Sequence, residues 1–221
     1  MIEDMVTIII PTYNEKDNIE KIENVLANIK GDFEVIFSDG FSPDGTYDYI
    51  SYPKIQETKY RSNQMNAAAK YAKGDYLFFL HCDSFIGPDC INIIKKSNLD
   101  AGCFSLKFEP TNSSLDFIEF FSNLRVRRKH IAFGDQGIFI KREIFEEIGG
   151  YKSIPLMEDY QLSMDIKEAG YKLKQVDYPI FTSSRRLEKH PLTTGFLMKV
   201  LQKMYRQGYD VEKISKLYKR I

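Results

Sequence analysis

The chain has 221 residues, of which 43% are hydrophobic and 28% are charged. This length is enough for one sizeable core and is short for two ordinary enzyme domains. Its longest apolar stretches fall far below the roughly 20 residues of a transmembrane helix, and its N-terminus lacks the pattern of a secretion signal. The cysteines Cys82, Cys90 and Cys103 include no C-x-x-C pair, which disfavours a disulfide framework and a zinc ribbon, so we expect a cytoplasmic protein.

The charge is balanced over the whole chain but not along it. Lysine plus arginine and aspartate plus glutamate both number 31. From Arg185 to Ile221, ten basic residues face three acidic ones, so this tail carries +7 and the remainder −7. A basic tail favours an anionic surface or ligand, whereas general nucleic-acid binding would usually make the whole domain basic.

The first third of the chain alternates between strand and helix patterns. Runs of β-branched and aromatic residues mark the strands, and apolar residues at helical spacing mark the helices between them. In chain order we expect a strand at 5–10, a helix at 19–29, a strand at 34–38, a helix at 63–73 and a strand at 76–81. This alternation predicts an α/β protein with a parallel sheet.

The rest of the chain follows a different pattern, which predicts that the sheet becomes mixed. We expect a helix at 88–97, a strand at 101–108, a helix within 113–130, a strand at 136–140, a helix at 158–169 and a strand at 173–176. Beyond Pro191 the pattern is helical, and Gly208 with Asp210 as N-cap divides it into two helices. We therefore expect a main domain at 1–190 and a helical appendage at 191–221, packed on the domain, on a partner subunit or on a membrane surface.

Polar residues follow three of the predicted strands. They are Pro11-Thr12-Tyr13-Asn14-Glu15, the segment from Asp39 to Thr46, and His81-Cys82-Asp83-Ser84. Open parallel sheets bind ligands at this edge. Each segment also has a structural interpretation, in which Thr12 or Asn14 caps a helix, residues 42–45 form a turn and Asp83 caps a turn.

The glycine spacing excludes two common nucleotide-binding motifs. The sequence contains neither G-x-G-x-x-G nor G-x-x-x-x-G-K-[ST], which disfavours a Rossmann dehydrogenase and a P-loop NTPase. A phosphate-bearing ligand would then be held by a divalent metal on few carboxylates, and Asp83 is the natural candidate.

The ordered set of motifs resembles the family-2 glycosyltransferases of the GT-A fold, and more narrowly a compact bacterial subgroup of that family. The motifs are Pro11-Thr12-Tyr13-Asn14-Glu15, Asp39-Gly40-x-Ser42-x-Asp44-Gly45-Thr46, Arg61-x-x-Gln64-Met65-Asn66, Phe79-Leu80-His81-x-Asp83, Phe133-Gly134-Asp135-Gln136-Gly137, Pro155-Leu156-Met157-Glu158-Asp159 and Ser184-Arg185-Arg186. The resemblance covers essentially the whole chain. It implies a mixed, mainly parallel central sheet flanked by helices.

The resemblance also implies a nucleotide pocket. Pro11, Tyr13 and Glu15 would line it, Asp39 would accept a hydrogen bond from the base, and Arg61 would lie near the base or the phosphates. Asp83 would hold a divalent metal, Mn²⁺ or Mg²⁺, that bridges the diphosphate.

The usual D-x-D motif is His81-Cys82-Asp83 in this chain. Histidine suits Mn²⁺ better than Mg²⁺, but His81 can equally bind the ribose or a phosphate of the nucleotide, or be a structural histidine. The resemblance favours Asp83 as the sole protein carboxylate on the metal.

The catalytic residues implied by the resemblance are Asp159, as the base, and Glu158 beside it. The base would take the proton of a hydroxyl acceptor, and in-line displacement would invert the anomeric centre. The alternative is that both carboxylates only complement the dipole of the helix that they begin.

The remaining implied contacts concern the sugar and the diphosphate. Asp135 and Gln136 would lie beside the sugar or acceptor, unless residues 134–137 are only a turn. Arg185 and Arg186 stand where the wider family often carries Gln-x-x-Arg-Trp, with Leu187 in place of the aromatic residue. One of these arginines would clamp the diphosphate.

Two basic stretches suggest partners. Residues 125–130 either receive an anionic acceptor or form a solvated helix face. The C-terminal helices place Phe196, Leu197 and Met204 beside Lys199 and Lys203, a pattern typical of a helix on an anionic membrane, on its own domain or on a second subunit of a homodimer.

We therefore predict an inverting, metal-assisted transferase that moves a sugar from a nucleotide-diphosphate donor, UDP in the first place, to a hydroxyl acceptor such as a glycan or a lipid-linked sugar. The enzyme would be cytoplasmic or peripheral at the inner face of the membrane. The alternatives are an inactive nucleotide-sugar-binding scaffold, with His81 as the sign of lost activity, and a sugar-1-phosphate nucleotidyltransferase. The second is disfavoured because the first loop lacks a glycine- and basic-rich triphosphate site.

Overall fold

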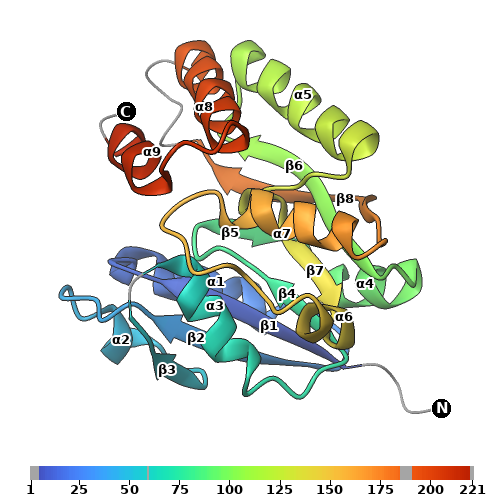
Figure 1. The fold of residues 1–221 in the computed structure, drawn as a ribbon. Helices are drawn as coiled ribbons and strands as arrows, with labels where there is room; N and C mark the ends of the chain where they lie inside the picture. Colours follow the sequence, from blue (N-terminus) through green and yellow to red (C-terminus); the bar gives the residue numbers. More distant parts are fainter. Residues whose placement is uncertain (1–4, 59, 185–190, 220–221) are drawn as a thin grey trace.

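The computed structural model describes residues 5–58, 60–184 and 191–219. Within them the strands form one sheet in the order β3-β2-β1-β4-β7-β6-β8-β5 (Figure 1). The strands are β1 Val6–Thr12, β2 Phe33–Asp39, β3 Lys54–Gln56, β4 Tyr76–Phe79, β5 Ser84–Ile86, β6 Ala101–Glu109, β7 Ile138–Lys141 and β8 Leu173–Ser183. The β1–β4 half is parallel, β7 is antiparallel to both of its neighbours, β6 and β8 are parallel, and β5 is antiparallel to β8. The sheet is therefore mixed and mainly parallel, as predicted.

Helices cover both faces of this sheet (Figure 1). They are α1 Lys16–Ala27, α2 Thr46–Tyr49, α3 Arg61–Ala69, α4 Cys90–Ser97, α5 Ser113–Lys129, α6 Arg142–Glu147, α7 Glu158–Glu168, α8 Pro191–Arg206 and α9 Val211–Tyr218, with a 3-10 turn at Gly134–Gln136. The alternation of β1 divides the core, because successive strand residues point to opposite faces. Ile8 packs in a cluster with apolar residues of α1 and α4, whereas Ile9 packs with those of α3, α6 and α7.

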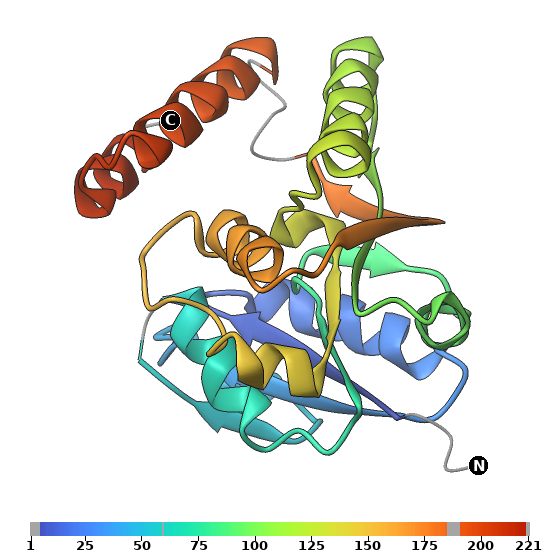
Figure 2. The ribbon, with the colours of Figure 1, turned by 45° about the vertical axis from the view of Figure 1, so that its right-hand side comes forward.

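The C-terminal helices lie outside the sheet and the helices that cover it (Figure 2), and they contact the domain through a small apolar cluster. Leu201 of α8 and Ile214 of α9 are buried in a small cluster with Met157 and Tyr160, at the start of α7. The Tyr205 hydroxyl donates to Gln161 Oε1 at 2.6 Å. Asp210 caps α9 as predicted, because its Oδ1 accepts from the backbone N–H of Glu212 at 2.8 Å.

The predicted elements from the first strand to the last helices are present, with three corrections. The strand expected at 136–140 begins at Ile138, because residues 134–136 form the 3-10 turn. The strand expected at 173–176 continues to Ser183, passing through Pro179 beyond an irregularity opposite β6. Neither Thr12 nor Asn14 caps α1, whose N-cap Glu15 makes no side-chain capping bond.

Four short elements escaped the sequence pattern, namely α2, β3, β5 and α6. Each is too short for hydrophobic periodicity to develop. None of the described helices combines the length and the apolar character that crossing a bilayer requires.

Candidate active site

The ends of β1 and β2 are held together by buried hydrogen bonds, and we call them the floor of the candidate site. Asp39 is fully buried, and its Oδ1 accepts from the hydroxyls of Thr12 at 3.2 Å and Ser42 at 2.5 Å. Its Oδ2 accepts from the backbone N–H of Ser42 at 2.8 Å. Gln64 of α3 donates to the backbone oxygens of Thr12 and Ser38 at 2.6 and 2.9 Å, which ties both strand ends to that helix. The Asp39 carboxylate is thus fixed in orientation by its own loop.

The loop after β2 is fastened to the loop after β1. Backbone N–H groups of Asn14 and Glu15 donate to the hydroxyls of Ser42 at 2.9 Å and Thr46 at 3.0 Å. The Asp44 carboxylate accepts from the Thr46 hydroxyl at 2.6 Å, a bond that lowers the pKa of this exposed aspartate. The turn predicted for 42–45 is therefore present. Its hydrogen bonds fix the two loops that border the floor, which we call the rim.

Two aromatic rings stand exposed on this rim, Tyr13 at 54% and Phe41 at 57%. A Cβ atom on Gly40 would come within 3.1 Å of the Tyr13 ring, so the ring packs directly on that glycine. Pro11 is buried within β1, whereas Glu15 is half-buried and accepts from Asn18 Nδ2 at 2.5 Å. Among Pro11, Tyr13 and Glu15, which were predicted to line a nucleotide pocket, Tyr13 is the exposed one. The exposed ring of Phe41 on the same rim was not predicted.

Arg61 begins α3 and faces the two acids that begin α7. Its guanidinium lies 3.5 Å from Glu158 Oε1. The three side chains come from elements nearly a hundred residues apart in sequence, and the structure brings them together. Glu158 and Asp159 are buried, with 6% and 7% of their surfaces exposed, which is unusual for helix-dipole partners on a surface.

Asp159 is the most strongly perturbed acid of the group. Its Oδ2 accepts from the backbone N–H of Gly134 at 2.9 Å. Its Oδ1 is buried near the Tyr151 hydroxyl, and neither of these two atoms makes a hydrogen bond of normal geometry. Burial and the neighbouring Glu158 raise its pKa to about 8, against the opposing effect of Arg61. The carboxyl group is therefore poised to exchange a proton near neutral pH.

His81 lies beside the same backbone atom. A Cβ atom on Gly134 would come 2.3 Å from His81 Nε2 and 2.7 Å from Asp159 Oδ2, so both side chains pack against this glycine. His81 and Asp159, both predicted site residues, thus meet at Gly134, which the sequence analysis named only as part of a motif. Gly134 therefore has two effects: its lack of a side chain leaves room for His81, and its backbone N–H binds Asp159.

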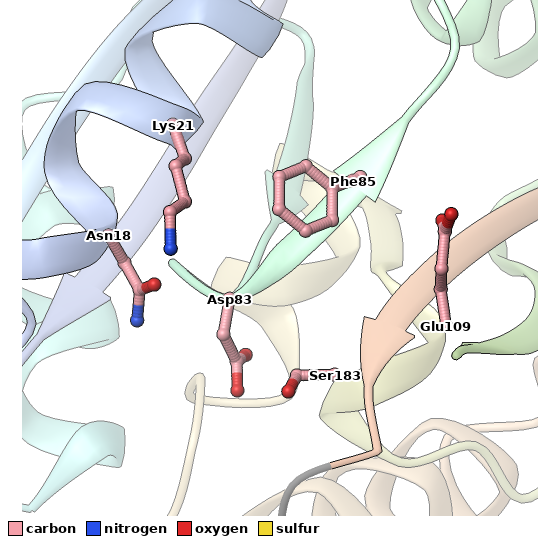
Figure 3. Close-up of a pocket in the computed structure, with 6 residues that line it drawn as sticks. All are labelled: Asn18, Lys21, Asp83, Phe85, Glu109 and Ser183. Carbon is pink, nitrogen blue, oxygen red and sulfur yellow. The ribbon is translucent and has the colours of Figure 1, made fainter. Parts of the chain in front are cut away.

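Asp83 lies between β4 and β5 and lines a cavity of about 160 Å³ (Figure 3). Its carboxylate is directed toward the side where Ser183 ends β8, and Asn18 and Lys21 reach the cavity from α1. Phe85 and Glu109 complete the lining. Asn18 and Lys21 were not predicted, because two polar residues three apart on an amphipathic helix have the pattern of a solvated face.

Arg125 of α5 organises the loop that follows it. Its guanidinium lies 4.2 Å from the centre of the Phe133 ring, and it donates to Gln136 Oε1 at 2.8 Å and to the backbone oxygen of Ile131 at 3.1 Å. The expectation of a basic face at 125–130 is therefore wrong for Arg125, which points inward. Arg127, Arg128 and Lys129 are exposed.

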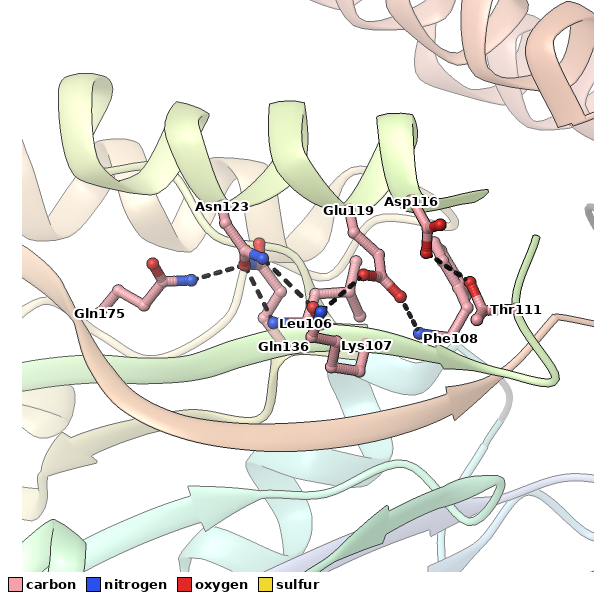
Figure 4. Close-up of polar contacts among 9 residues, drawn as sticks. All are labelled: Leu106, Lys107, Phe108, Thr111, Asp116, Glu119, Asn123, Gln136 and Gln175. Carbon is pink, nitrogen blue, oxygen red and sulfur yellow. Dashed lines mark hydrogen bonds and ion pairs between the residues drawn. The ribbon is translucent and has the colours of Figure 1, made fainter. Parts of the chain in front are cut away.

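Gln136 differs from its predicted role beside the sugar. It is fully buried, and its amide nitrogen donates to Asn123 Oδ1 at 3.4 Å (Figure 4). With Arg125 on its other side, Gln136 fixes the loop instead of facing a ligand. Its neighbour Asp135 is half-buried and keeps an Oδ1 that is buried without a hydrogen-bond partner.

Asp83 offers a carboxylate that fits a divalent cation, because carboxylate oxygens are the hard donors that Mg²⁺ and Mn²⁺ prefer. Burial raises the pKa of Asp135, while Arg125 opposes this shift and Asp83 adds to it. Among the described residues no three His, Cys, Asp or Glu side chains form a metal site, and Arg185 and Arg186 lie outside those residues.

Comparison with known proteins gives a consistent result. The sequence model described as glycosyl transferase family 2 matches residues 7–149. An uncharacterized glycosyltransferase of Haemophilus influenzae is 27% identical over 208 residues, which are 86% of this chain and 67% of the relative. The UDP-Glc:α-D-GlcNAc-diphosphoundecaprenol β-1,3-glucosyltransferase WfaP of Escherichia coli is 34% identical over 93 residues, 37% of this chain and 36% of the relative.

Among solved structures, a mannosyltransferase from Pyrobaculum calidifontis, in complex with GDP-Man and Mn²⁺, superposes with a TM-score of 0.72 at 19% identity. The match covers 95% of this chain and 66% of that one. This chain thus spans about two thirds of the Haemophilus and Pyrobaculum proteins and about a third of the Escherichia coli enzyme.

Proposed function

Since the chain belongs to glycosyl transferase family 2 and has the GT-A fold, we propose that it moves one sugar from a nucleotide-diphosphate donor to a hydroxyl acceptor with inversion at the anomeric carbon. The observation that carries the proposal is the Asp159 carboxyl group, buried at the start of α7 with one oxygen that makes no hydrogen bond of normal geometry and a pKa of about 8. It lies among His81, Gly134 and Arg61, at the ligand-binding edge of the sheet.

Asp159 acts in this proposal as the general base. Its Oδ1 takes the proton of the acceptor hydroxyl while the acceptor oxygen bonds to the anomeric carbon. The bond from that carbon to the diphosphate oxygen breaks, and the nucleoside diphosphate leaves with the electron pair. Gly134 holds the other carboxylate oxygen, so the proton-accepting oxygen is oriented before the acceptor arrives. Glu158 supports the base by raising its pKa and by its ion pair with Arg61.

The donor nucleotide occupies the rim at the ends of β1 and β2. The Tyr13 ring stacks on the base or ribose, Pro11 and Glu15 shape the pocket, and Asp39 accepts from an N–H of the base. Arg61 and His81 stand on the phosphate side. UDP is the first candidate base, supported by the UDP-Glc named for the Escherichia coli relative, and the GDP-Man named for the archaeal structure makes guanine the second.

A divalent cation, Mn²⁺ or Mg²⁺, would be held by Asp83, and it would supply charge to neutralise the leaving diphosphate. Asp135 binds hydroxyls of the transferred sugar from the neighbouring loop. Arg185 and Arg186 follow β8 and would contribute a further clamp on the diphosphate.

The acceptor and the setting are part of the same proposal. A lipid-linked acceptor is supported by the diphosphoundecaprenol in the name of one relative. We place the enzyme in the cytoplasm, peripheral at the inner face of the membrane, with residues 1–190 as the catalytic unit and 191–221 as a helical addition that could also pair in a homodimer.

A donor panel tests the proposal. UDP-, GDP- and dTDP-sugars are each mixed with the protein and Mn²⁺, Mg²⁺ or a chelator, and thermal shift and nucleoside diphosphate release are measured. One nucleotide is expected to raise the melting temperature, since a ligand at 100 times Kd stabilises by about 2.7 kcal/mol, and to be turned over slowly to nucleoside diphosphate. Binding without any release, with or without glycan acceptors, would favour an inactive nucleotide-sugar-binding protein.

A further inference from the structure

Helix α5 carries apolar side chains on both of its faces. On the inner face, Leu115 and Val126 are buried, and Ile118 packs beside Leu115. On the outer face, Phe117, Phe120 and Phe121 are spaced three and four residues apart and are exposed. Three adjacent exposed aromatic rings form an apolar patch on this outer face, and exposed apolar patches mark interaction sites.

The exposed rings continue onto α8 as one surface. Phe117 and Phe121 lie 4.5 Å apart between ring centres, and Phe120 lies 5.3 Å from Phe121. The start of α8 rests on α5, because a Cβ atom on Gly195 would meet Ile118 at 3.5 Å. The residue after that glycine, Phe196, is 70% exposed. We call these four exposed residues, Phe117, Phe120, Phe121 and Phe196, the α5–α8 aromatic surface.

Basic side chains border this surface. The Lys199 ammonium lies 5.4 Å from the centre of the Phe121 ring, and Lys203 is exposed one helical turn further along α8. Arg128 is exposed two turns beyond Phe121 on α5.

The nearby acids are already engaged. Glu119 is buried, and it accepts from Lys107 Nζ at 3.1 Å and from the backbone N–H of Phe108 (Figure 4). Asp116 accepts from the Thr111 hydroxyl at 2.8 Å. The border of the aromatic surface therefore presents the basic groups of Lys199, Lys203 and Arg128 and one exposed carboxylate, that of Asp116.

We propose that the α5–α8 aromatic surface docks on an anionic phospholipid bilayer. Phenyl rings enter the boundary between headgroups and acyl chains, and lysine and arginine at the border bind the phosphates. This differs from a membrane helix formed by α8 alone, because Leu201 is buried and Met204 packs with the cluster beneath α8. The docking element is instead the outer face of α5 together with the first turns of α8.

This inference rests on the membrane contact included in the proposed function, and it names the surface that makes the contact. It is tested without any nucleotide sugar, so either proposal can fail alone. A second copy of the chain is the competing occupant, and the experiments below separate it from a bilayer.

The chain contains no tryptophan, so one introduced tryptophan reports on its own surroundings. Phe120→Trp is compared with Tyr71→Trp, an exposed aromatic position on a different part of the chain. With vesicles of equal parts phosphatidylcholine and phosphatidylglycerol, the emission of Phe120→Trp is expected to shift to shorter wavelength and that of Tyr71→Trp to stay unchanged. Equal shifts, or none, would overturn the proposal.

Vesicle sedimentation measures the strength of docking. The triple variant Phe117→Ala, Phe120→Ala, Phe121→Ala is expected to partition at least roughly tenfold more weakly than the parent and than Tyr71→Ala. The pair Lys199→Gln, Arg128→Gln is expected to lose affinity for the anionic vesicles at low salt, with little change at high salt. Unchanged partition of the triple variant would overturn the proposal. So would a parent that light scattering shows to be a dimer and a triple variant that is a monomer.

Discussion

The backbone N–H of Gly134 donates to Asp159 Oδ2 at 2.9 Å, and the same glycine leaves the space that the His81 ring occupies. One position without a side chain therefore orients a buried carboxylate and admits a histidine beside it. The arrangement joins the loop after α5 to the start of α7.

Asp159→Asn tests the base directly. Asparagine keeps the size and the acceptor for Gly134 but accepts no proton, so transfer is expected to fall by about 10²–10⁴-fold while donor affinity stays within a factor of about two. Steady-state kinetics and donor titration measure the two effects. Glu158→Gln is the matched variant at the adjacent carboxylate and is expected to retain more activity; transfer by Asp159→Asn at the parent rate would remove Asp159 from the reaction.

The raised pKa of Asp159 predicts how activity depends on pH. A base must be deprotonated, so kcat/KM for donor and acceptor is expected to rise with pH and to level off above about 8. Rates measured from pH 6 to 9 check this. A profile that falls over this range would contradict the assignment.

The same shift predicts a stability effect. The folded-state pKa of Asp159, about 8, lies above the ordinary value of 3.8, so its contribution to stability is complete below 3.8 and is lost as pH rises through 8. Asp159→Asn removes this loss, and its melting temperature is expected to exceed that of the parent by a margin that grows from pH 5 to 8. Each kcal/mol corresponds to about 2–4 °C for a chain of this size. A margin that shrinks with pH would be inconsistent with a buried, protonated carboxyl group.

Gly134→Ala tests the packing at the centre of the site. The added methyl would lie 2.3 Å from His81 and 2.7 Å from Asp159, so both side chains must move and kcat is expected to fall by about 10². Gly195→Ala is the control, because a methyl there meets ordinary contact at 3.5 Å. Full activity in Gly134→Ala would show that the placement of these side chains is unimportant.

Asp83→Ala tests the cation site. The stimulation of donor binding by Mn²⁺ or Mg²⁺ is expected to weaken by at least roughly 10–100-fold, the loss typical when even an outer-shell partner of a metal ligand is removed. Asp89→Ala is the matched control, since Asp89 lies nearby in sequence and makes no side-chain cap bond to α4. Isothermal titration with and without chelator distinguishes the two; equal metal dependence in both variants would place the cation elsewhere.

Arg125→Lys tests the support behind the loop. Lysine cannot both stack flat on Phe133 and donate to Gln136 and Ile131, so we expect a loss of about 1.5–3 kcal/mol in unfolding free energy and a lower kcat. Arg128→Lys on the same helix, where the arginine is exposed, is expected to leave both near the parent values. Chemical denaturation and kinetics measure them.

The strands β1, β2 and β4 were predictable because they are mostly buried runs of β-branched or aromatic residues. The strand β5 was not, since Ser84–Ile86 is held in place by its pairing with β8, a hundred residues away in sequence. The inward orientation of the Arg125 side chain could not be predicted for a similar reason. A basic residue in a basic stretch has the local pattern of a solvated face, and only the tertiary fold brings Phe133 and Gln136 to it.

The candidate site likewise has residues that the sequence could nominate and orientations that it could not predict. Short motifs at strand ends were enough to nominate Asp39, His81 and Asp83, because the edge of a parallel sheet gathers them, whereas Asp159 was nominated by the family resemblance. Whether a nominated side chain faces a ligand or the interior depends on packing. Gln136 is the clearest case, since its motif placed it beside a sugar and its burial makes it a structural support.

The antiparallel pairing of β4 with β7 has a consequence for how such a protein can diversify. The residues proposed to bind the nucleotide follow the parallel strands on one side of this seam, whereas the proposed base Asp159 lies on a segment that follows β7. We expect the acceptor-facing half to change its preferences over evolution while the nucleotide rim is inherited intact. Exchanging residues 142–183 between related enzymes, without the proposed diphosphate clamp that follows them, is then expected to transfer acceptor choice without altering the donor.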